Sequence, residues 1–375
     1  MVSKRSVAVR PSGIREIFDM ATEGAINLGL GELDFDPPEE AKDALKKACV
    51  SGTSKYGPTA GLMELRELIA SNEAKHSDAI TARNVLVTGG ATEGIMAVYQ
   101  VLLDPGDEIL VPDPGFVLYS PDAALVGARP IPYGLHEETG FMPNVSQIEE
   151  LITPRTKAIV VNSPSNPTGG IISKEVFSGL LDLATDHKIW IISDEVYEDF
   201  IYDTRPFTFA GSLENSIVVN SFSKSLAVPG WRIGYLLAND ELLRELSKMQ
   251  YYLLACPATP IQQAVTAALP HKDKFIGRIL PILDARRKRM VSLLNEIPGF
   301  SCGLPSGAFY AFPRYDLRIP SRELAEKIVS AGVINSPGSA FGRLGEGHLR
   351  FSYVASEEDI SRGIEIVGSV VEHLT

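Results

Sequence analysis

The feature that most constrains the fold of this chain is a series of short strands that are apolar throughout and alternate with helical patterns. A strand with one solvated face alternates apolar and polar residues, so uninterrupted apolar strands indicate a sheet buried on both faces. Such a sheet is mostly parallel and is flanked by helices, which predicts an α/β fold. The expected strands are residues 84–88, 108–112, 157–161, 189–193 and 216–220, and the clearest helices are residues 92–103 and 174–187.

The pattern changes near residue 270. A chain of 375 residues exceeds what one hydrophobic core usually serves, so two domains are expected. We predict a large domain over residues 40–270, a small C-terminal α+β domain over residues 271–375, and a loop-like segment 1–39 that packs with the small domain. The expected elements of the small domain are helices at about 272–296, 322–330 and from 357, and strands at 308–312 and 349–353.

The composition argues against several classes of function. The formal net charge is −12, whereas a surface that binds nucleic acid needs clustered Lys and Arg. The one dense basic run, residues 286–289, lies within a helical apolar pattern, so we expect it to form a solvated helix face. The six histidines are scattered, which predicts no metal site. The absence of a long apolar run argues against a membrane span, and the polar N-terminus and three separated cysteines favour the cytoplasm.

Polar segments follow four of the expected strands. In open α/β sheets, ligands bind outside the carboxyl ends of the strands, so these segments are expected to converge on one site. They are Gly89–Thr92, Asn162–Gly169, Asp194–Tyr197 and Ser221–Lys224. The Gly89-Gly90 turn opens a helix and would suit an anion, although a plain tight turn explains it equally well.

Lys224 follows a buried apolar strand, where an ammonium group is costly unless it has a function. Hydroxyl groups on Ser221 and Ser223 and the guanidinium of Arg232, in Gly230-Trp-Arg-Ile-Gly234, would suit a phosphate. A surface lysine with a structural ion pair is the alternative for a lone lysine. The two motifs together favour a cofactor site instead.

Asp194 and Tyr197 fit the chemistry of pyridoxal phosphate. That cofactor is an electron sink only while its ring nitrogen is protonated, and a buried carboxylate keeps it so. Tyr197 and Asn166 would donate to the ring oxygen and lower the pKa of an imine at Lys224. The alternatives are that Asp194 caps a helix and that Tyr197 is a core aromatic.

Taken together, the motifs resemble the fold-type I pyridoxal-phosphate aminotransferases of the aspartate and aromatic group. The resemblance covers nearly the whole chain, and its motifs occur in the order of the family. It is carried by Tyr56-Gly-Pro-Thr-Ala-Gly61, Asn162–Gly169, Asp194–Tyr197, Ser221–Lys224 with Gly230-Trp-Arg232, and Leu349-Arg-Phe-Ser352. It implies a homodimer that transfers an amino group from an α-amino acid to a 2-oxo acid, such as 2-oxoglutarate, by a ping-pong mechanism.

The resemblance also implies roles for the cofactor-binding residues. Lys224 would hold pyridoxal phosphate as a Schiff base and, once freed, move a proton between substrate and cofactor. Asp194 would pair with the ring nitrogen, and Tyr197 and Asn166 with the ring oxygen, while Phe116 would stack on the ring. The phosphate would be bound by Ala91, Thr92, Ser221, Ser223 and Arg232, joined by Tyr56 of the neighbouring subunit.

For the substrate, the resemblance implies that Arg350 binds the α-carboxylate. Gly31 would line the substrate pocket through its backbone, beside Phe116 and Asn166. The position of Arg350 alone is equally consistent with a surface arginine at a strand edge.

The substrate itself stays open. The style of the motifs favours aspartate, but the segment 250–263, which corresponds to the source of a distal-carboxylate arginine in animal-type aspartate enzymes, contains no arginine. Tyr251, Tyr252 and Leu253 in that segment would also suit an aromatic or aliphatic side chain. A C–S β-lyase on the same fold is a further alternative, because the motifs describe the cofactor more than the bond broken. A cofactor-sensing DNA-binding regulator is not expected, because only about thirty residues precede Gly31.

Overall fold

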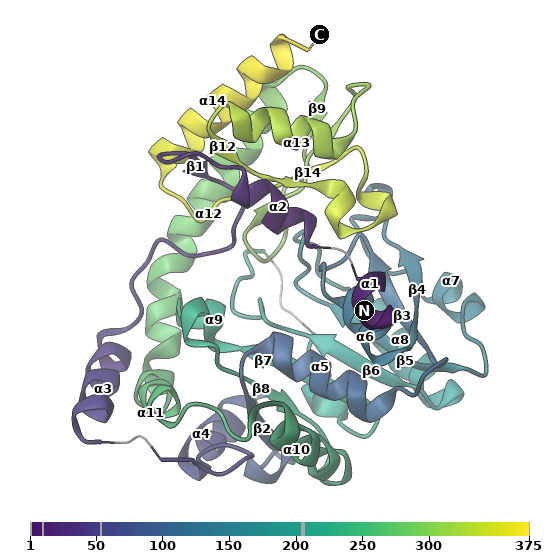
Figure 1. The fold of residues 1–375 in the computed structure, drawn as a ribbon, viewed down its shortest axis with the longest axis vertical. Coiled ribbons are helices and arrows are strands. Elements are labelled where there is room, and N and C mark those ends of the chain that lie inside the picture. Colours follow the sequence, from purple (N-terminus) through teal and green to yellow (C-terminus); the bar gives the residue numbers. More distant parts are fainter. Residues whose placement is uncertain (1, 10, 53–54, 204–206, 375) are drawn as a thin grey trace.

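The centre of the computed structural model, which describes residues 2–9, 11–52, 55–203 and 207–374, is a seven-stranded sheet (Figure 1). Its order is β2-β8-β7-β6-β5-β3-β4, and only the two pairings of β8 are antiparallel. The predicted α/β fold with a mostly parallel sheet is therefore confirmed. The strands are β2 (Val85–Thr88), β3 (Glu108–Asp113), β4 (Arg129–Gly134), β5 (Thr156–Asn162), β6 (Trp190–Asp194), β7 (Ser216–Ser221) and β8 (Gly234–Leu237).

Both faces of this sheet are covered by helices, which explains why its inner strands are apolar at every position. Side chains alternate between two apolar clusters, so that Val85 and Val87 lie on one face and Leu86 on the other. The face with Leu86 packs against α5 (Ala91–Leu102), α6 (Tyr119–Val126) and α10 (Asp240–Leu254). The opposite face packs against α4 (Met63–Glu73), α7 (Val145–Glu150), α8 (Lys174–His187) and α11 (Thr259–Ala268), and α11 in turn contacts α3 (Glu39–Val50).

A third apolar cluster lies in the C-terminal part of the chain. The long helix α12 (Lys272–Glu296) leads into it, and α13 (Ser321–Ser330) and α14 (Glu357–Glu372) pack with it. Its small sheet has the order β10-β14-β13, formed by β10 (Tyr310–Ala311), β14 (Leu349–Ser352) and β13 (Ser336–Pro337). A separate antiparallel pair joins β9 (Phe300–Ser301) to β11 (Arg314–Tyr315).

Most of the N-terminal segment lies against this C-terminal cluster. The strand β1 (Ile26–Asn27) pairs in parallel with β12 (Val333–Ile334), and Ile17 of α2 (Gly13–Asp19) belongs to the same apolar cluster. The short helix α1 (Lys4–Ala8) differs, because its Arg5 donates to the Leu125 carbonyl in α6 at 3.2 Å. These contacts support our proposal of a large domain over 40–270, a small domain over 271–375, and a segment 1–39 that packs mainly with the small one.

The prediction for the basic run in α12 is wrong for two of its four residues. Arg286 is 7% exposed and Arg287 is 1% exposed. Arg286 forms an ion pair with Asp34 at 2.8 Å, and Arg287 forms one with Asp203 at 2.9 Å. Four consecutive residues span a full helical turn, so they cannot all lie on one solvated face. The inward arginines are tolerated because each is paired.

No helix among the described residues combines the length and apolarity needed to cross a bilayer.

Candidate active site

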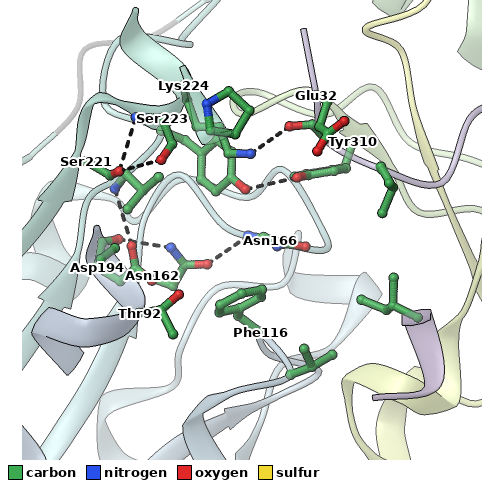
Figure 2. A pocket seen from close by; sticks show the side chains of 18 of the residues that line it. Glu32, Thr92, Phe116, Asn162, Asn166, Asp194, Ser221, Ser223, Lys224 and Tyr310 are labelled. Carbon is green, nitrogen blue, oxygen red and sulfur yellow. Dashed lines mark hydrogen bonds between the residues drawn. The ribbon is translucent and has the colours of Figure 1, made fainter. Parts of the chain in front are cut away.

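A cavity of about 330 Å³ opens at the carboxyl edge of the seven-stranded sheet (Figure 2). The ends of β6 and β7 and the start of α5 line it from the sheet, and β10 and β14 line it from the C-terminal part. Apart from Tyr56, every residue predicted to form the site is part of this lining. Tyr56 lies elsewhere on the surface and is 90% exposed.

Lys224 lies in the one-turn helix α9 (Phe222–Ser225), directly after β7. Its Nζ donates to the backbone carbonyl of Gly31 at 2.6 Å. Burial lowers the pKa of its ammonium group to about 8, although the nearby Glu32 carboxylate raises it. A larger fraction of free amine is thus present near neutral pH than in an ordinary lysine, which is what a nucleophile or a general base needs.

Asp194, at the end of β6, is a buried carboxylate without a cation partner. Tyr119 donates from Oη to Asp194 Oδ2 at 2.6 Å, and the Val196 N–H donates to Oδ1 at 3.3 Å. Burial raises the pKa of Asp194 to about 6 despite these donors. No ion pair joins Asp194 to any side chain that the structure describes. The protonated ring nitrogen of pyridoxal phosphate would supply the positive charge that Asp194 lacks.

Tyr119 was not among the predicted site residues. It follows Phe116 by three positions, and the two rings pack edge to face with centroids 5.7 Å apart. Their proximity in the sequence is the only signal that would have identified Tyr119, because its acceptor Asp194 lies far away in the chain.

The start of α5 and Arg232 form a corner of the cavity that is rich in hydrogen-bond donors. Its N-cap Gly90 has φ 92° and makes no side-chain capping bond, so the first helical N–H groups, at Ala91 and Thr92, are available to a ligand. A Cβ atom at Gly90 would come within 2.7 Å of Arg232 Nη2, so the guanidinium lies directly against this turn.

Two hydroxyl groups complete this corner. Ser221 Oγ donates to Ser223 Oγ at 2.9 Å, and the backbone N–H of Ser223 donates to Ser221 Oγ at 3.1 Å. Backbone N–H groups, hydroxyls and a guanidinium at a helix N-terminus are the donor set that a phosphate group requires. The residues present therefore fit the phosphate of pyridoxal phosphate.

Arg350, in β14, is 3% exposed, so the alternative of a surface arginine is wrong. Its Nη1 donates to Asn166 Oδ1 at 2.9 Å, and its Nη2 donates to the Gly29 carbonyl. The guanidinium lies between the rings of Tyr310 and Phe341, at 4.4 and 4.8 Å from their centroids. Its Nε is buried and has no hydrogen-bond partner among the described residues. A buried guanidinium that contacts only neutral groups and has an unused N–H suits a carboxylate ligand.

Two tyrosines and two asparagines shape the space between Lys224 and Arg350. The hydroxyls of Tyr197 and Tyr310 are 2.9 Å apart. A Cβ atom at Gly31 would come within 2.0 Å of the Tyr310 hydroxyl, so glycine is required there. Asn162 donates from Nδ2 to the Asp194 carbonyl at 2.9 Å and accepts the Asn166 N–H at 2.8 Å. Tyr310 and Asn162 were not predicted as site residues, although each lies within a segment that the sequence singles out.

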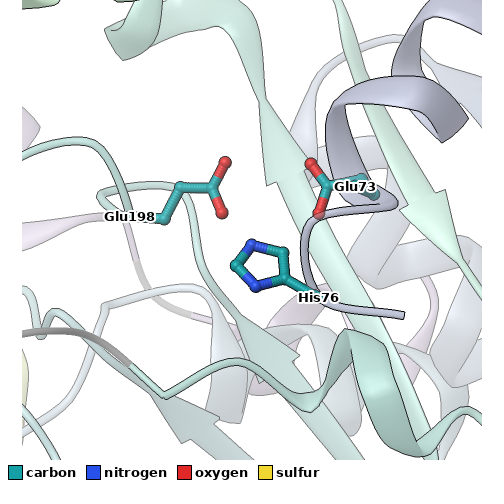
Figure 3. Close-up of side chains that lie close together, drawn as sticks. All are labelled: Glu73, His76 and Glu198. Atoms are coloured by element: carbon teal, nitrogen blue, oxygen red, sulfur yellow. The ribbon is translucent and has the colours of Figure 1, made fainter. Parts of the chain in front are cut away.

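A second group of ionisable side chains lies outside the pocket. Glu73, His76 and Glu198 each bring one possible ligand atom within 4.8 Å of the others (Figure 3). The ammonium of Lys272 lies 3.8 Å from Glu198 Oε1 and 2.8 Å from Asp199 Oδ1. Because this ammonium already provides the positive charge that buried carboxylates need, we assign no metal to the group.

Comparison with known proteins agrees with this geometry. The family model described as aminotransferase class I and II matches residues 23–367. The aspartate aminotransferase of Pyrococcus horikoshii is 37% identical over 380 residues, which cover 99% of this chain and 97% of that protein. The aromatic-amino-acid aminotransferase 2 of Thermococcus litoralis is also 37% identical, with 99% and 98% covered.

The fold agrees as closely as the sequence. The structure of a single mutant of Thermus thermophilus aspartate aminotransferase matches with a TM-score of 0.94 at 33% identity, and the match covers 99% of each chain. The chain therefore belongs to the class I and II aminotransferases, and it is an enzyme that transfers amino groups with pyridoxal phosphate as its cofactor.

Proposed function

We propose that this aminotransferase takes the amino group of aspartate and passes it to 2-oxoglutarate or a similar 2-oxo acid. The observation that carries the proposal is one pocket that contains an amine of lowered pKa, a buried carboxylate lacking a cation and a buried arginine with an unused N–H. Aspartate is favoured because aspartate aminotransferases stand among the most similar relatives and structures.

Pyridoxal phosphate, when bound, supplies an electron sink that makes the proton on the substrate α-carbon removable. We assign its phosphate to the corner formed by α5, Ser221, Ser223 and Arg232. Asp194 would hold the proton on the ring nitrogen, because a carboxylate in this buried position is far more stable beside a positive charge. Phe116 would pack against the ring.

The ring oxygen is assigned to Tyr197 and Asn166. Asn166 accepts from Arg350 through Oδ1, which leaves its Nδ2 as the donor for a ligand. The Tyr197 hydroxyl shares one hydrogen bond with Tyr310 and can still engage a second partner. Asn166 thereby links the cofactor site to the arginine that binds the substrate.

Lys224 is assigned two tasks, covalent attachment of the cofactor and proton transfer. Once the substrate amine has displaced it, its Nζ would take the proton from the substrate α-carbon. The pKa of about 8 places this amine near the working pH, where general-base catalysis is most effective. The Gly31 carbonyl, which accepts from Nζ at 2.6 Å, would hold the free amine within the pocket.

Arg350 would bind the α-carboxylate of both substrates in turn. The amino acid and the 2-oxo acid use the same pocket, so one arginine serves both half-reactions. Its fixed position between two rings and Asn166 would orient the α-carbon toward Lys224.

We also propose a homodimer in which Tyr56 reaches the phosphate site of the partner. Tyr56 is 90% exposed, and Tyr251 and Tyr252 at the end of α10 are 59% and 80% exposed. Large aromatic side chains on a surface are typical of a protein interface. The three free cysteines support our further proposal that the enzyme works in the cytoplasm.

An aromatic amino acid is the second candidate donor. The relative from Thermococcus litoralis favours it, as does the apolar part of the lining at Ile14, Leu30 and Val117. A panel of amino donors with 2-oxoglutarate distinguishes the two: we expect aspartate to have the highest kcat/KM. Preference for phenylalanine or tyrosine would move the assignment to the aromatic donor, and ammonia released without an acceptor would indicate a lyase.

A further inference from the structure

Arg15 is the pocket cation to which the proposed mechanism gives no task. Among the described residues that line the cavity, the cations are Lys224, Arg232, Arg350 and Arg15. Lys224 is assigned to cofactor attachment and proton transfer, Arg232 to the cofactor phosphate, and Arg350 to the substrate α-carboxylate. We propose that Arg15 binds the distal carboxylate of dicarboxylic substrates and so sets the preference for acidic over neutral amino acids. This inference deepens the proposed function and rests on it.

The position of Arg15 agrees with this task. It belongs to α2, which packs against β13, and β13 pairs with β14 through Ser336 and Arg350. Arg15 and Arg350 are therefore carried by neighbouring elements on the same side of the pocket. In Figure 1, α2 lies where the C-terminal part faces the edge of the large sheet.

The rest of the lining restricts where a substrate side chain can go. With its α-carbon facing Lys224 and its α-carboxylate at Arg350, an amino acid must direct its side chain toward the remaining lining. That part contains apolar side chains, one hydroxyl and two charged groups, which belong to Ile14, Leu30, Val117, Ser12, Arg15 and Glu32. An apolar wall with one cation fits a short methylene chain that ends in a carboxylate.

Arg15 is free to change partners. Its side chain is 68% exposed, and its Nε contacts Asp19 Oδ1 at 2.9 Å across one helical turn. An exposed pair of this kind contributes little to stability, so a substrate carboxylate can replace Asp19 at small cost. Glu32 is an exposed acid of the same lining, and it opposes a second carboxylate unless a cation such as Arg15 offsets it.

The test compares Arg15→Gln with two matched variants in the holoenzyme. Asp19→Asn removes the competing carboxylate, and Arg322→Gln removes a contact of α2 outside the pocket, the ion pair with Glu16 at 2.8 Å. Single-turnover rates with aspartate and with phenylalanine, in the absence of any acceptor, avoid interference from a dicarboxylic 2-oxo acid. Binding of succinate and of butyrate, which do not react, is measured by calorimetry.

We expect Arg15→Gln to weaken the binding of succinate by roughly 10- to 100-fold. The single-turnover rate with subsaturating aspartate should fall by the same factor. In the same variant, the rate with phenylalanine and the affinity for butyrate should change by less than about twofold. Asp19→Asn should bind succinate at least as well as the wild type does. Arg322→Gln should match the wild type in both rates and affinities.

Three results would overturn the proposal. If the wild type prefers acidic donors and Arg15→Gln keeps that preference, the Arg15 assignment alone is wrong. If the rates with aspartate and with phenylalanine fall equally in the variant, Arg15 supports the structure of the pocket and does not select substrates. If the wild type neither reacts with aspartate nor binds succinate, the proposed donor is wrong and the role of Arg15 falls with it.

Discussion

Tyr119 donates a hydrogen bond from Oη to Oδ2 of Asp194 at 2.6 Å, which joins the first residue of α6 to the end of β6. This bond stabilises the ionised carboxylate and holds the pKa of Asp194 lower than burial alone would set it. We therefore infer that Tyr119 favours the charged form of Asp194, and with it the protonated cofactor ring that we assign to this carboxylate.

We expect Tyr119→Phe to raise the pKa of Asp194 and to shift the acidic limb of the kcat profile toward higher pH. The kcat at pH 7 should fall by roughly tenfold, because a protonated Asp194 no longer retains the ring proton. The profile of kcat against pH is the measurement. Tyr133→Phe removes another buried hydroxyl, which donates to the Val160 carbonyl, and serves as the control. An unshifted acidic limb would show that Tyr119 has no electrostatic role.

The buried carboxylate should cost the cofactor-free protein stability. Asp194 has a raised pKa, so the folded state holds its proton between pH about 4 and 6 whereas the unfolded state does not. Stability from this group is therefore greatest below that window and falls as the pH rises through it, by roughly 2–3 kcal/mol. In urea unfolding of the cofactor-free protein, Asp194→Asn should raise the free energy of unfolding at pH 7.5. At pH 4 the variant and the wild type should be equally stable. Destabilisation by the variant at pH 7.5 would contradict this account.

Lys224→Ala should abolish transfer and covalent attachment while the other cofactor contacts remain. We expect a loss of at least about 10³-fold in kcat, because both the attachment and the proton transfer depend on the same amine. After borohydride reduction, mass spectrometry should find the cofactor on the peptide with Lys224 in the wild type and on no peptide of the variant. Lys327→Ala, on the exposed surface of α13, is the control. Cofactor trapped on another lysine of the wild type would refute the assignment.

Arg350→Gln should weaken the binding of every amino acid and 2-oxo acid substrate to the same extent. We assign the arginine to the α-carboxylate that all substrates share, so KM should rise by roughly 100-fold for aspartate, alanine and phenylalanine. Steady-state kinetics with each donor measures this. The pattern differs from that expected of Arg15→Gln, and a loss confined to one class of side chain would place Arg350 elsewhere in the pocket.

Much of the fold could be predicted because the inner strands are apolar at every position. The expected strand 157–161 is β5, Thr156–Asn162, and 216–220 is β7, Ser216–Ser221. The edge strand β4 was not predicted, because Pro130 and Pro132 argue against a strand interior and are tolerated only where an N–H is not needed. The strand β8 begins at Gly234, within a motif that was interpreted for its arginine alone.

The site could be predicted as far as its residues follow the sheet. Lys224 and Asp194 each come at or directly after a strand, so their convergence follows from a parallel arrangement. Tyr119 and Tyr310 act through partners that are distant in sequence, and their hydrogen bonds depend on how two parts of the fold meet. Arg15 lies in a segment whose sequence carries no motif, and only the packing of α2 brings it to the pocket.

The proposed dimer predicts a defect that depends on the partner chain. Tyr56→Phe removes one hydroxyl from a side chain that is 90% exposed in the isolated chain, so it should not affect folding. If Tyr56 donates to the phosphate in the partner subunit, the dissociation constant for pyridoxal phosphate should rise by roughly 5- to 20-fold while light scattering still shows a dimer. Mixed dimers with Tyr56→Phe on one chain and Lys224→Ala on the other sharpen the test. A tyrosine that crosses leaves one site with both changes and one with neither, whereas a tyrosine that stays in its own subunit leaves one change in each site. If Tyr56 acts across the interface, the site with intact Lys224 receives an intact Tyr56 from the partner that carries Lys224→Ala alone. Wild-type cofactor affinity at that site supports the crossing of Tyr56, and affinity as weak as in the Tyr56→Phe homodimer would show that each site uses its own tyrosine.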